Sequence, residues 1–297
     1  MSRQRRSGAF PTRLFAFQLA RATGVAVRET GLQVVQYKSR KHATVLVQFA
    51  EAATEYDLYS RSDVIVKHFT DQARDSMAME KEVLAFANQA GLCVPRILEV
   101  LDNFLILEFI KGPTLIDVIN ATRTLDQSNI DDITGDKQPI IDSLAAWLGQ
   151  FHETFEGHAM ATRRGDANLR NFILSASGGV AGLDFEEACV GDPLVDVYEI
   201  LDSLFFSSPG IFTAPLEDLG WKFDLCEGFL TAYLERRPGA KDMFDAFPDR
   251  FMTGLEAVMG NLAKIRELSG PFASLFPAFG ERLLAVLERL RDLQGQR

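Results

Sequence analysis

Hydrophobic and polar positions divide the chain into a strand-like part followed by a helical part. Between residues 44 and 69 the apolar residues form short, β-branched and partly alternating runs, which is the pattern of antiparallel strands. The three runs are Val45 to Phe49, Tyr56 to Tyr59 and Val64 to Phe69. From Met79 to Ala90 the apolar spacing changes to three and four residues, which predicts a helix that stops at Gly91. Three strands followed by one helix are therefore expected.

The pattern then returns to a strand before it becomes helical. Val100 to Ile110 is a strand-like run that ends at the turn residues Gly112 and Pro113. The polar, Asp-rich segment from Arg123 to Lys137 predicts a loop. Apolar stripes with helical spacing follow it. They comprise Ile141, Leu144, Leu148, Phe151 and Phe155; then Val197, Ile200, Leu201, Leu204 and Phe205; then Leu255, Val258, Met259, Leu262 and Ile265; and last Leu283, Leu287 and Leu290.

This order of elements predicts an α+β protein with two lobes. The smaller lobe is expected over residues 44–112, with an antiparallel sheet and one helix. The larger, mainly helical lobe is expected over residues 113–297. Residues 1–43 are treated as an N-terminal extension with a basic tail at its start. We interpret the tail arginines as solvated, with contact to an anionic membrane surface as the alternative; they are Arg3, Arg5, Arg6 and Arg13.

Composition narrows the class of partner. The chain of 297 residues has a net charge of -10, which opposes binding to nucleic acid. Its three cysteines, Cys93, Cys189 and Cys226, are far apart and predict neither a disulfide framework nor a zinc cluster, so a cytoplasmic setting is expected. No secretory signal and no apolar run long enough to cross a membrane is apparent in the sequence.

Oxygen-bearing side chains gather in one stretch between the predicted helices. Asp166 is followed five positions later by Asn171 and a short apolar strand. A second apolar strand ends at Asp184-Phe185. Phosphoryl transfer needs an oriented hydroxyl and phosphates neutralised by magnesium and a lysine, and hard oxygen ligands suit that ion.

This stretch resembles the catalytic and metal loops of the kinase-like superfamily. It is most similar to aminoglycoside phosphotransferase-like enzymes, whose loop reads His-Gly-Asp with an asparagine five residues after the aspartate. The resemblance implies a bilobal protein-kinase-like fold that uses ATP and Mg²⁺. It assigns Asp166 as the catalytic base and Asn171 and Asp184 as the magnesium ligands. Asp196, in Gly191 to Asp196, would buttress the catalytic loop, although a plain helix N-terminal charge predicts nearly the same position.

The kinase pattern also requires a lysine on a strand of the small lobe and a glutamate on the next helix. Lys67 lies inside an apolar strand, where an unpaired ammonium group would be costly to bury. Glu80 lies on the following helix, and Glu82 is the alternative partner. By resemblance, Lys67 and Glu80 form the ion pair that holds the α- and β-phosphates. Backbone groups near Glu108 and Ile110 would meet the adenine edge.

The sequence departs from this family at two places that bear on activity. Arg164 stands where the family has histidine, and a permanent cation beside Asp166 would favour its ionised form and weaken its basicity. The loop Ala50 to Glu55 lacks glycine, which phosphate-covering loops use to bring backbone amides close. This loop is similar to the Ala-Glu-Ala loop of small atypical kinases related to the tRNA-modifying KEOPS complex.

The acceptor is expected to be a hydroxyl group of a small molecule. Only five residues separate Phe185 from Gly191, which leaves no room for a peptide-binding activation segment. A cationic acceptor is a further hypothesis, because acidic residues flank the motifs; they are Asp126, Asp131, Asp132, Asp136, Glu186 and Glu187. Two alternatives stay open: an atypical protein or lipopolysaccharide-core sugar kinase, and a non-catalytic kinase-like nucleotide-binding protein.

Overall fold

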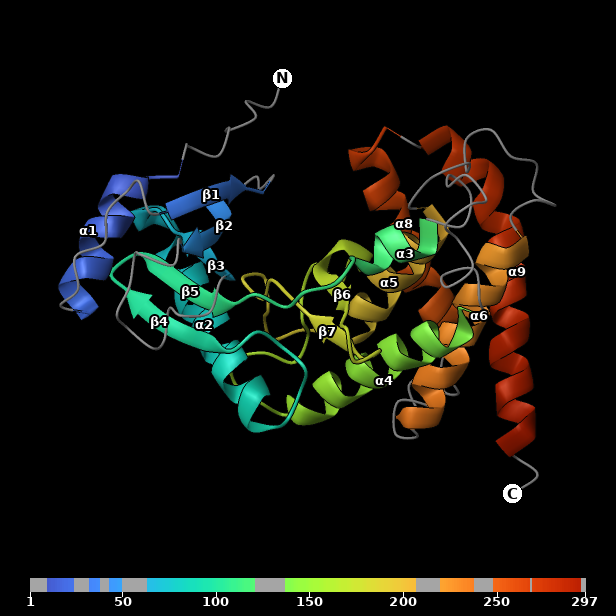
Figure 1. Ribbon diagram of the computed structural model, residues 1–297. Coiled ribbons are helices and arrows are strands. Elements are labelled where there is room, and N and C mark those ends of the chain that lie inside the picture. The colour runs from blue at the N-terminus through green and yellow to red at the C-terminus, as the bar shows by residue number, and fades with distance from the viewer. Residues whose placement is uncertain are drawn as a thin grey trace, which may run out of the picture. The chain divides into compact units, whose positions relative to one another are not determined.

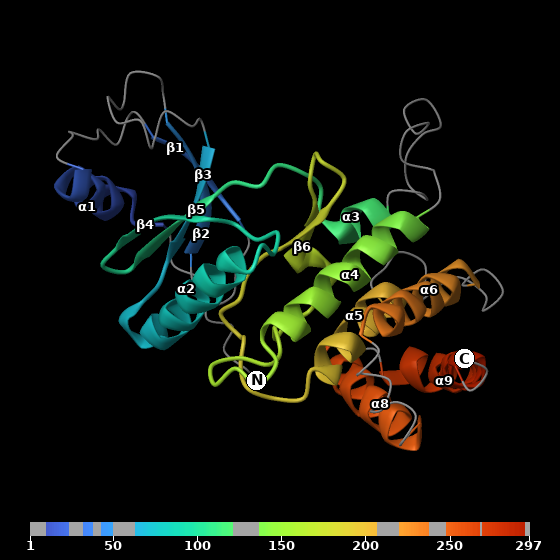
Figure 2. The ribbon, with the colours of Figure 1, turned by 90° about the horizontal axis from the view of Figure 1, so that it is seen from below.

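The chain folds into two compact units. The structure is a computed structural model that describes residues 10–23, 32–37, 43–49, 63–120, 137–206, 220–237, 248–267 and 269–294 (Figures 1 and 2). The first unit comprises Met1–Ile110 together with Asp184–Glu187, and the second comprises Lys111–Leu183 and Ala188–Arg297. Within the described residues, no helix is both long and apolar enough to span a bilayer.

The first unit is built on a five-stranded antiparallel sheet with the order β1-β2-β3-β5-β4. The strands are β1 (Leu32–Gln36), β2 (Ala43–Phe49), β3 (Asp63–His68), β4 (Ile97–Leu101) and β5 (Phe104–Glu108). In the central strand β3, Lys67 is aligned with Thr44 of β2 on one side and with Leu105 of β5 on the other. Hydrogen bonding on both sides thus fixes the backbone that carries this lysine.

The two faces of the sheet are covered by different helices, because alternate residues of a strand point to opposite faces. Val64 and Val66 of β3 belong to a buried cluster that also contains Phe15 and Leu19 of α1 (Thr12–Thr23). Lys67 points to the opposite face, where its ammonium group meets Glu80 of α2 (Arg74–Gln89). Helix α2 therefore covers the polar side of β3.

The described part of the second unit is mainly helical and includes a short hairpin (Figure 1). Among its described residues the helices are α3 (Leu115–Asn120), α4 (Gln138–Thr154), α5 (Leu194–Phe206), α6 (Gly220–Arg236), α8 (Pro248–Ile265) and α9 (Ser269–Gln294). Helix α6 packs against α4, α5 and α9, and α8 packs against α5 and α9. The hairpin of β6 (Phe172–Leu174) and β7 (Val180–Gly182) packs on α4 through β7. Gly182 is required there, because an added Cβ would lie 2.3 Å from the Trp147 ring.

The α+β class predicted from the sequence is confirmed, and so are the main helical stripes. All predicted core positions of α4 and α5 are buried. Helix α2 ends before Gly91, which has a φ of +77°, so the stop predicted from the sequence is also confirmed. Ile265 is an exception to the α8 stripe, since it is 71% exposed.

The beginning of the first unit differs from the sequence prediction. Residues 12–23 and 32–36, which we treated as part of an extension, form α1 and the edge strand β1 of the sheet. Arg13 therefore belongs to a helix rather than to a tail. The run Val100 to Ile110, expected as one strand, contains the end of β4, a turn at Asp102 and Asn103, and β5.

Some sequence predictions fall outside the described residues. They concern the strand Tyr56 to Tyr59, the glycine-free loop Ala50 to Glu55, the tail residues Arg3, Arg5 and Arg6, and the loop residues Asp126, Asp131, Asp132 and Asp136.

Candidate active site

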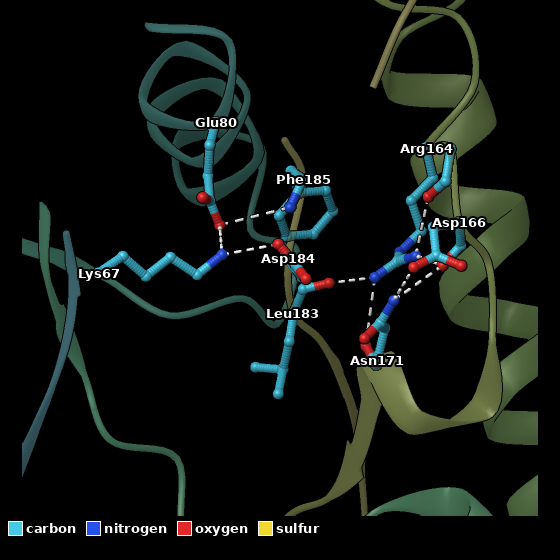
Figure 3. A network of polar contacts seen from close by, with 9 residues as sticks. Lys67, Glu80, Arg164, Asp166, Asn171, Leu183, Asp184 and Phe185 are labelled. Carbon is cyan, nitrogen blue, oxygen red and sulfur yellow. Dashed lines mark hydrogen bonds and ion pairs between the residues drawn. The ribbon is translucent and has the colours of Figure 1, made fainter. Parts of the chain in front are cut away.

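Lys67 contacts two carboxylates within the first unit. Its Nζ lies 2.6 Å from Oε1 of Glu80 and 2.7 Å from Oδ1 of Asp184 (Figure 3). The side chains of Lys67 and Glu80 are 6% and 0% exposed, whereas that of Asp184 is 34% exposed. Glu82, the alternative partner, is exposed on α2. Glu80 is therefore the α2 glutamate that pairs with Lys67.

The charges of this cluster favour the ammonium form of Lys67. Burial by itself would lower the pKa of Lys67, because it disfavours the charged form. The carboxylates of Glu80 and Asp184 outweigh burial and raise the pKa above its ordinary value. Lys67 thus carries a buried positive charge directed at a part-exposed carboxylate.

The backbone around Asp184 is held in an uncommon conformation. Asp184 has a φ of +60°, in the left-handed region that non-glycine residues seldom adopt. The next residue, Phe185, has a fully buried side chain, and its amide donates to Glu80 Oε1 at 3.4 Å. Glu80 therefore holds both Lys67 and the segment that carries Asp184. Such conformations are concentrated at functional sites, where neighbouring contacts maintain them.

The residues expected to meet adenine lie at the end of the first unit. Glu108 is the last residue of β5, and its amide donates to the Arg96 carbonyl oxygen at 2.9 Å. Its carboxylate accepts two hydrogen bonds from the Arg96 guanidinium, at 3.0 and 3.1 Å. Ile110 is the last residue of the unit before the chain enters the second unit. The strand end is thus fixed, while the assignment to adenine stays a prediction.

The second unit carries Asp166 and Asn171 on one loop, which we call the catalytic loop and define as residues 164–171. Asp166 is exposed and has a φ of +45°. The side-chain nitrogen Nδ2 of Asn171 donates to both the backbone oxygen and Oδ2 of Asp166, each at 3.0 Å. Asn171 ends the short 3-10 helix η5 (Leu169–Asn171) directly before β6. The structure thus brings together the two residues that the sequence pattern placed five positions apart.

Helix α5 holds the backbone amides of the catalytic loop. Asp196 accepts from the amides of Arg164 at 2.5 Å and of Gly165 at 3.0 Å. Glu199 accepts from the Ala167 amide at 2.7 Å, and Ser203 accepts from the Leu169 amide at 3.1 Å. These acceptors recur at spacings of three and four, so they lie on one side of α5.

Sequence reasoning identified only Asp196 in this role. Polar residues at helical spacing on an otherwise apolar helix were the signal that could have found Glu199 and Ser203.

A buried polar chain supports Asp196 from the opposite direction. His152 of α4 places Nε2 2.9 Å from Asp196 Oδ2 and Nδ1 2.8 Å from the Tyr233 hydroxyl of α6. All three side chains are buried. Burial raises the pKa of Tyr233 to about 12, so the phenol stays protonated at neutral pH. The catalytic loop is therefore tied through Asp196 to the core formed by α4, α5 and α6.

Arg164 is fully buried and contacts backbone oxygens. Its guanidinium donates to the carbonyl oxygens of Gly165, Asp166, Asn171 and Leu183 (Figure 3). From the sequence, Arg164 was expected only as a cation beside the Asp166 carboxylate. In the structure its donors are directed at main-chain carbonyl groups of the loop and of the adjacent hairpin.

Asp184 and Asn171 each carry an oxygen donor, the type of ligand that magnesium takes. The described residues contain no group of three or more His, Cys, Asp and Glu side chains that could hold a metal ion. Asp184 has a part-exposed carboxylate, and the Asn171 amide nitrogen is engaged by Asp166, which directs the amide oxygen elsewhere. Magnesium keeps several waters and takes one or two protein oxygens together with substrate phosphates. The oxygens of Asp184 in the first unit and of Asn171 in the second are each of the kind that this ion takes.

The raised pKa of Glu199, which lies beside the catalytic loop, predicts how stability depends on pH. Burial, together with Asp196 and Asp166, raises the pKa of Glu199 from 4.5 to about 7, against the lowering effects of the Ala167 amide and Arg163. Between these values the unfolded chain releases a proton that the folded chain keeps, so stability falls as pH rises from 4.5 to 7. We expect Glu199→Gln to reduce this fall, measured as the thermal midpoint across that range.

Glutamine still offers an oxygen to the Ala167 amide, so the substitution mainly removes the titration. Asp202, whose pKa burial raises to about 6, supplies a remaining part of the slope in both proteins. Glu256→Gln, at an exposed position of α8, is the control and should leave the slope as in the wild type. An equal slope in wild type and Glu199→Gln would contradict the assignment of this proton to Glu199.

The chain has matches among solved structures. No family model matches the chain, and no curated protein matches its sequence. Among the solved structures, the chain is similar to a choline kinase from Cryptosporidium parvum, with 11% sequence identity and a TM-score of 0.48. The match covers 96% of this chain and 97% of the choline kinase chain.

Proposed function

We propose that the protein is an ATP- and Mg²⁺-dependent phosphotransferase that transfers the γ-phosphate to a hydroxyl group of a small molecule. The observation that supports this most strongly is the contact of buried Lys67 with both Glu80 and Asp184 inside the first unit. A lysine held between a buried and a part-exposed carboxylate fits a phosphate-binding group beside a metal ligand.

Each remaining role follows from the chemistry of the side chain. Asp166 would accept the proton of the acceptor hydroxyl, since its carboxylate is exposed on a loop held from several sides. Asn171 and Asp184 would hold Mg²⁺, which neutralises phosphate charge when it is bound. Backbone groups at Glu108 and Ile110 would meet the adenine edge. Lys67 would contact the α- and β-phosphates while Glu80 keeps it in place.

A small acceptor is favoured by how the chain continues after Glu187. Cys189 and Arg163 exchange two backbone hydrogen bonds, at 3.1 and 3.2 Å. The Thr162 hydroxyl donates to the Gly191 oxygen at 2.6 Å and accepts from the Gly191 amide at 2.9 Å. Residues that follow Phe185 by four to six positions are thus hydrogen-bonded to the two residues directly before the catalytic loop. This short connection leaves no segment for docking a peptide substrate.

The test is a screen of the purified protein for Mg²⁺-dependent ADP release. The panel should contain amino alcohols, sugars and neutral polyols, so that a cationic acceptor is compared directly with uncharged ones. Release of ADP with a panel compound, and transfer of labelled phosphate to it, would support the proposal. Transfer to total protein instead of metabolites would favour a protein kinase. Mg²⁺-linked ATP binding without any turnover would indicate a binding protein.

The magnesium assignment makes a prediction about binding that does not need the acceptor. We expect Asp184→Ala to remove most of the dependence of ATP affinity on Mg²⁺, because it deletes the acidic ligand. Calorimetric titration of ATP at several Mg²⁺ concentrations measures this. Glu187→Ala is the matched control, since Glu187 is an exposed carboxylate three residues later in the same unit. The same magnesium-linked affinity in wild type and Asp184→Ala would place the metal elsewhere.

A further inference from the structure

The Arg164 guanidinium joins two segments through two different nitrogens. Nη1 donates to the backbone oxygens of Gly165 at 3.1 Å and Asp166 at 2.5 Å, both on the catalytic loop. Nη2 donates to the oxygen of Asn171 at 3.3 Å and to that of Leu183. Asn171 directly precedes β6 and Leu183 directly follows β7, so Nη2 serves one end of the hairpin. That end also has a hydrogen bond of 2.8 Å from the Leu183 amide to the Asn171 oxygen.

The surroundings compensate the buried charge of Arg164. The side chain is fully buried and stacks with Cζ 4.7 Å from the Phe172 ring centre. Its backbone amide donates to the buried carboxylate of Asp196. A buried cation is costly unless it is compensated, and here the carbonyl oxygens that accept from Nη1 and Nη2 and the face of the Phe172 ring share that task. The guanidinium of Arg164 is therefore held in one position by its carbonyl partners and the Phe172 ring.

We infer that Arg164 is a positioning residue, whose guanidinium fixes the catalytic loop and ties it to the residue before Asp184. The loop is then held from two sides. Helix α5 accepts hydrogen bonds from its amides through Asp196, Glu199 and Ser203, and Arg164 donates to its carbonyls. The catalytic meaning of this arrangement rests on the proposed phosphotransferase function.

The geometry requires a guanidinium rather than another basic group. Arginine presents five N–H donors in a planar fork, so two nitrogens can serve two segments at once. Lysine carries its donors on a single nitrogen, so it cannot place one nitrogen at the loop and a second at the hairpin. A neutral histidine has one donor. An arginine at this position therefore joins the two segments through two separate nitrogens.

The first test compares kinetics of Arg164→Lys and Arg164→His with wild type. We expect both to lower kcat by about 10- to 100-fold, with the KM for ATP changed less than about threefold, since displaced catalytic groups affect the reacting geometry most. Arg282→Lys is the matched control, because the Arg282 guanidinium also stacks on a phenylalanine ring, 4.5 Å from Phe223, and pairs with Asp224. Full activity in either Arg164 variant would overturn the inference.

Hydrogen exchange of the same proteins separates positioning from general stability and does not depend on activity. We expect the amides of Asn168, Asn171 and Leu183 to exchange about tenfold faster or more in the Arg164 variants, because these amides bond within the loop and hairpin that Arg164 joins. Exchange in α6 and α9 should remain as in wild type.

Unchanged loop exchange, or a uniform increase throughout the second unit, would overturn the inference. A wild type without turnover would refute the proposed function alone, because the exchange comparison still decides the role of Arg164.

Discussion

Asp166→Asn should lower kcat by roughly two to four orders of magnitude while Mg²⁺-ATP binding stays close to that of the wild type. The substitution removes the basic oxygen but preserves the local structure. Asparagine tolerates the left-handed backbone conformation, which Asp166 adopts with a φ of +45°. Its amide oxygen can also accept the 3.0 Å hydrogen bond from Asn171. Single-turnover rates with the identified acceptor, together with calorimetry of ATP, would measure the two effects separately.

Asp102→Asn provides a matched control for this experiment. Asp102 is also exposed, has a φ of +29° and accepts a hydrogen bond of 3.1 Å from the Gln18 amide, but it lies in the first unit on the β4–β5 turn. Its turnover should equal that of the wild type. Unaltered turnover in Asp166→Asn would eliminate Asp166 as the base. A parallel loss of ATP binding would instead indicate a role in nucleotide affinity.

The sequence allowed prediction of those elements whose burial is periodic. Val64 and Val66 alternate with polar or opposite-facing positions in β3, and α4 and α5 each bury a continuous stripe. The edge strand β1 was missed because only one of its five residues, Leu32, is buried. Helix α1 was missed because its buried residues, Phe15, Ala16 and Leu19, occupy a short segment beside a basic tail.

The sequence predicted parts of the candidate site where a charged side chain stands in an apolar segment. Lys67 in an apolar strand required an acidic partner, and the order of motifs pointed to Glu80. The support of the catalytic loop was not predictable in the same way. Arg164 binds backbone carbonyl oxygens, which every residue possesses, so no sequence pattern marks its partners. Tyr233 and His152 meet across 81 positions, a pairing that only the packing of α4 against α6 creates.

Lys67→Met should reduce both stability and kcat/KM for ATP. It removes the cation that lies 2.6 Å from the fully buried Glu80 carboxylate, and breaking a buried ion pair from one side costs about 3–5 kcal/mol. It also removes the proposed phosphate contact, for which a loss of roughly two to three orders of magnitude in kcat/KM is expected. Thermal and urea midpoints report the first effect, and initial rates at limiting ATP report the second.

The double variant Lys67→Met/Glu80→Gln distinguishes these two effects. Replacing the buried carboxylate with a neutral amide removes the uncompensated charge, so most of the lost stability should return. Catalysis should not return, because the phosphates still lack their cation. Glu82→Gln, on the exposed side of α2, should change neither quantity. Recovery of kcat/KM in the double variant would mean that Lys67 only supports the fold, and the phosphate-binding role would have to be assigned to another residue.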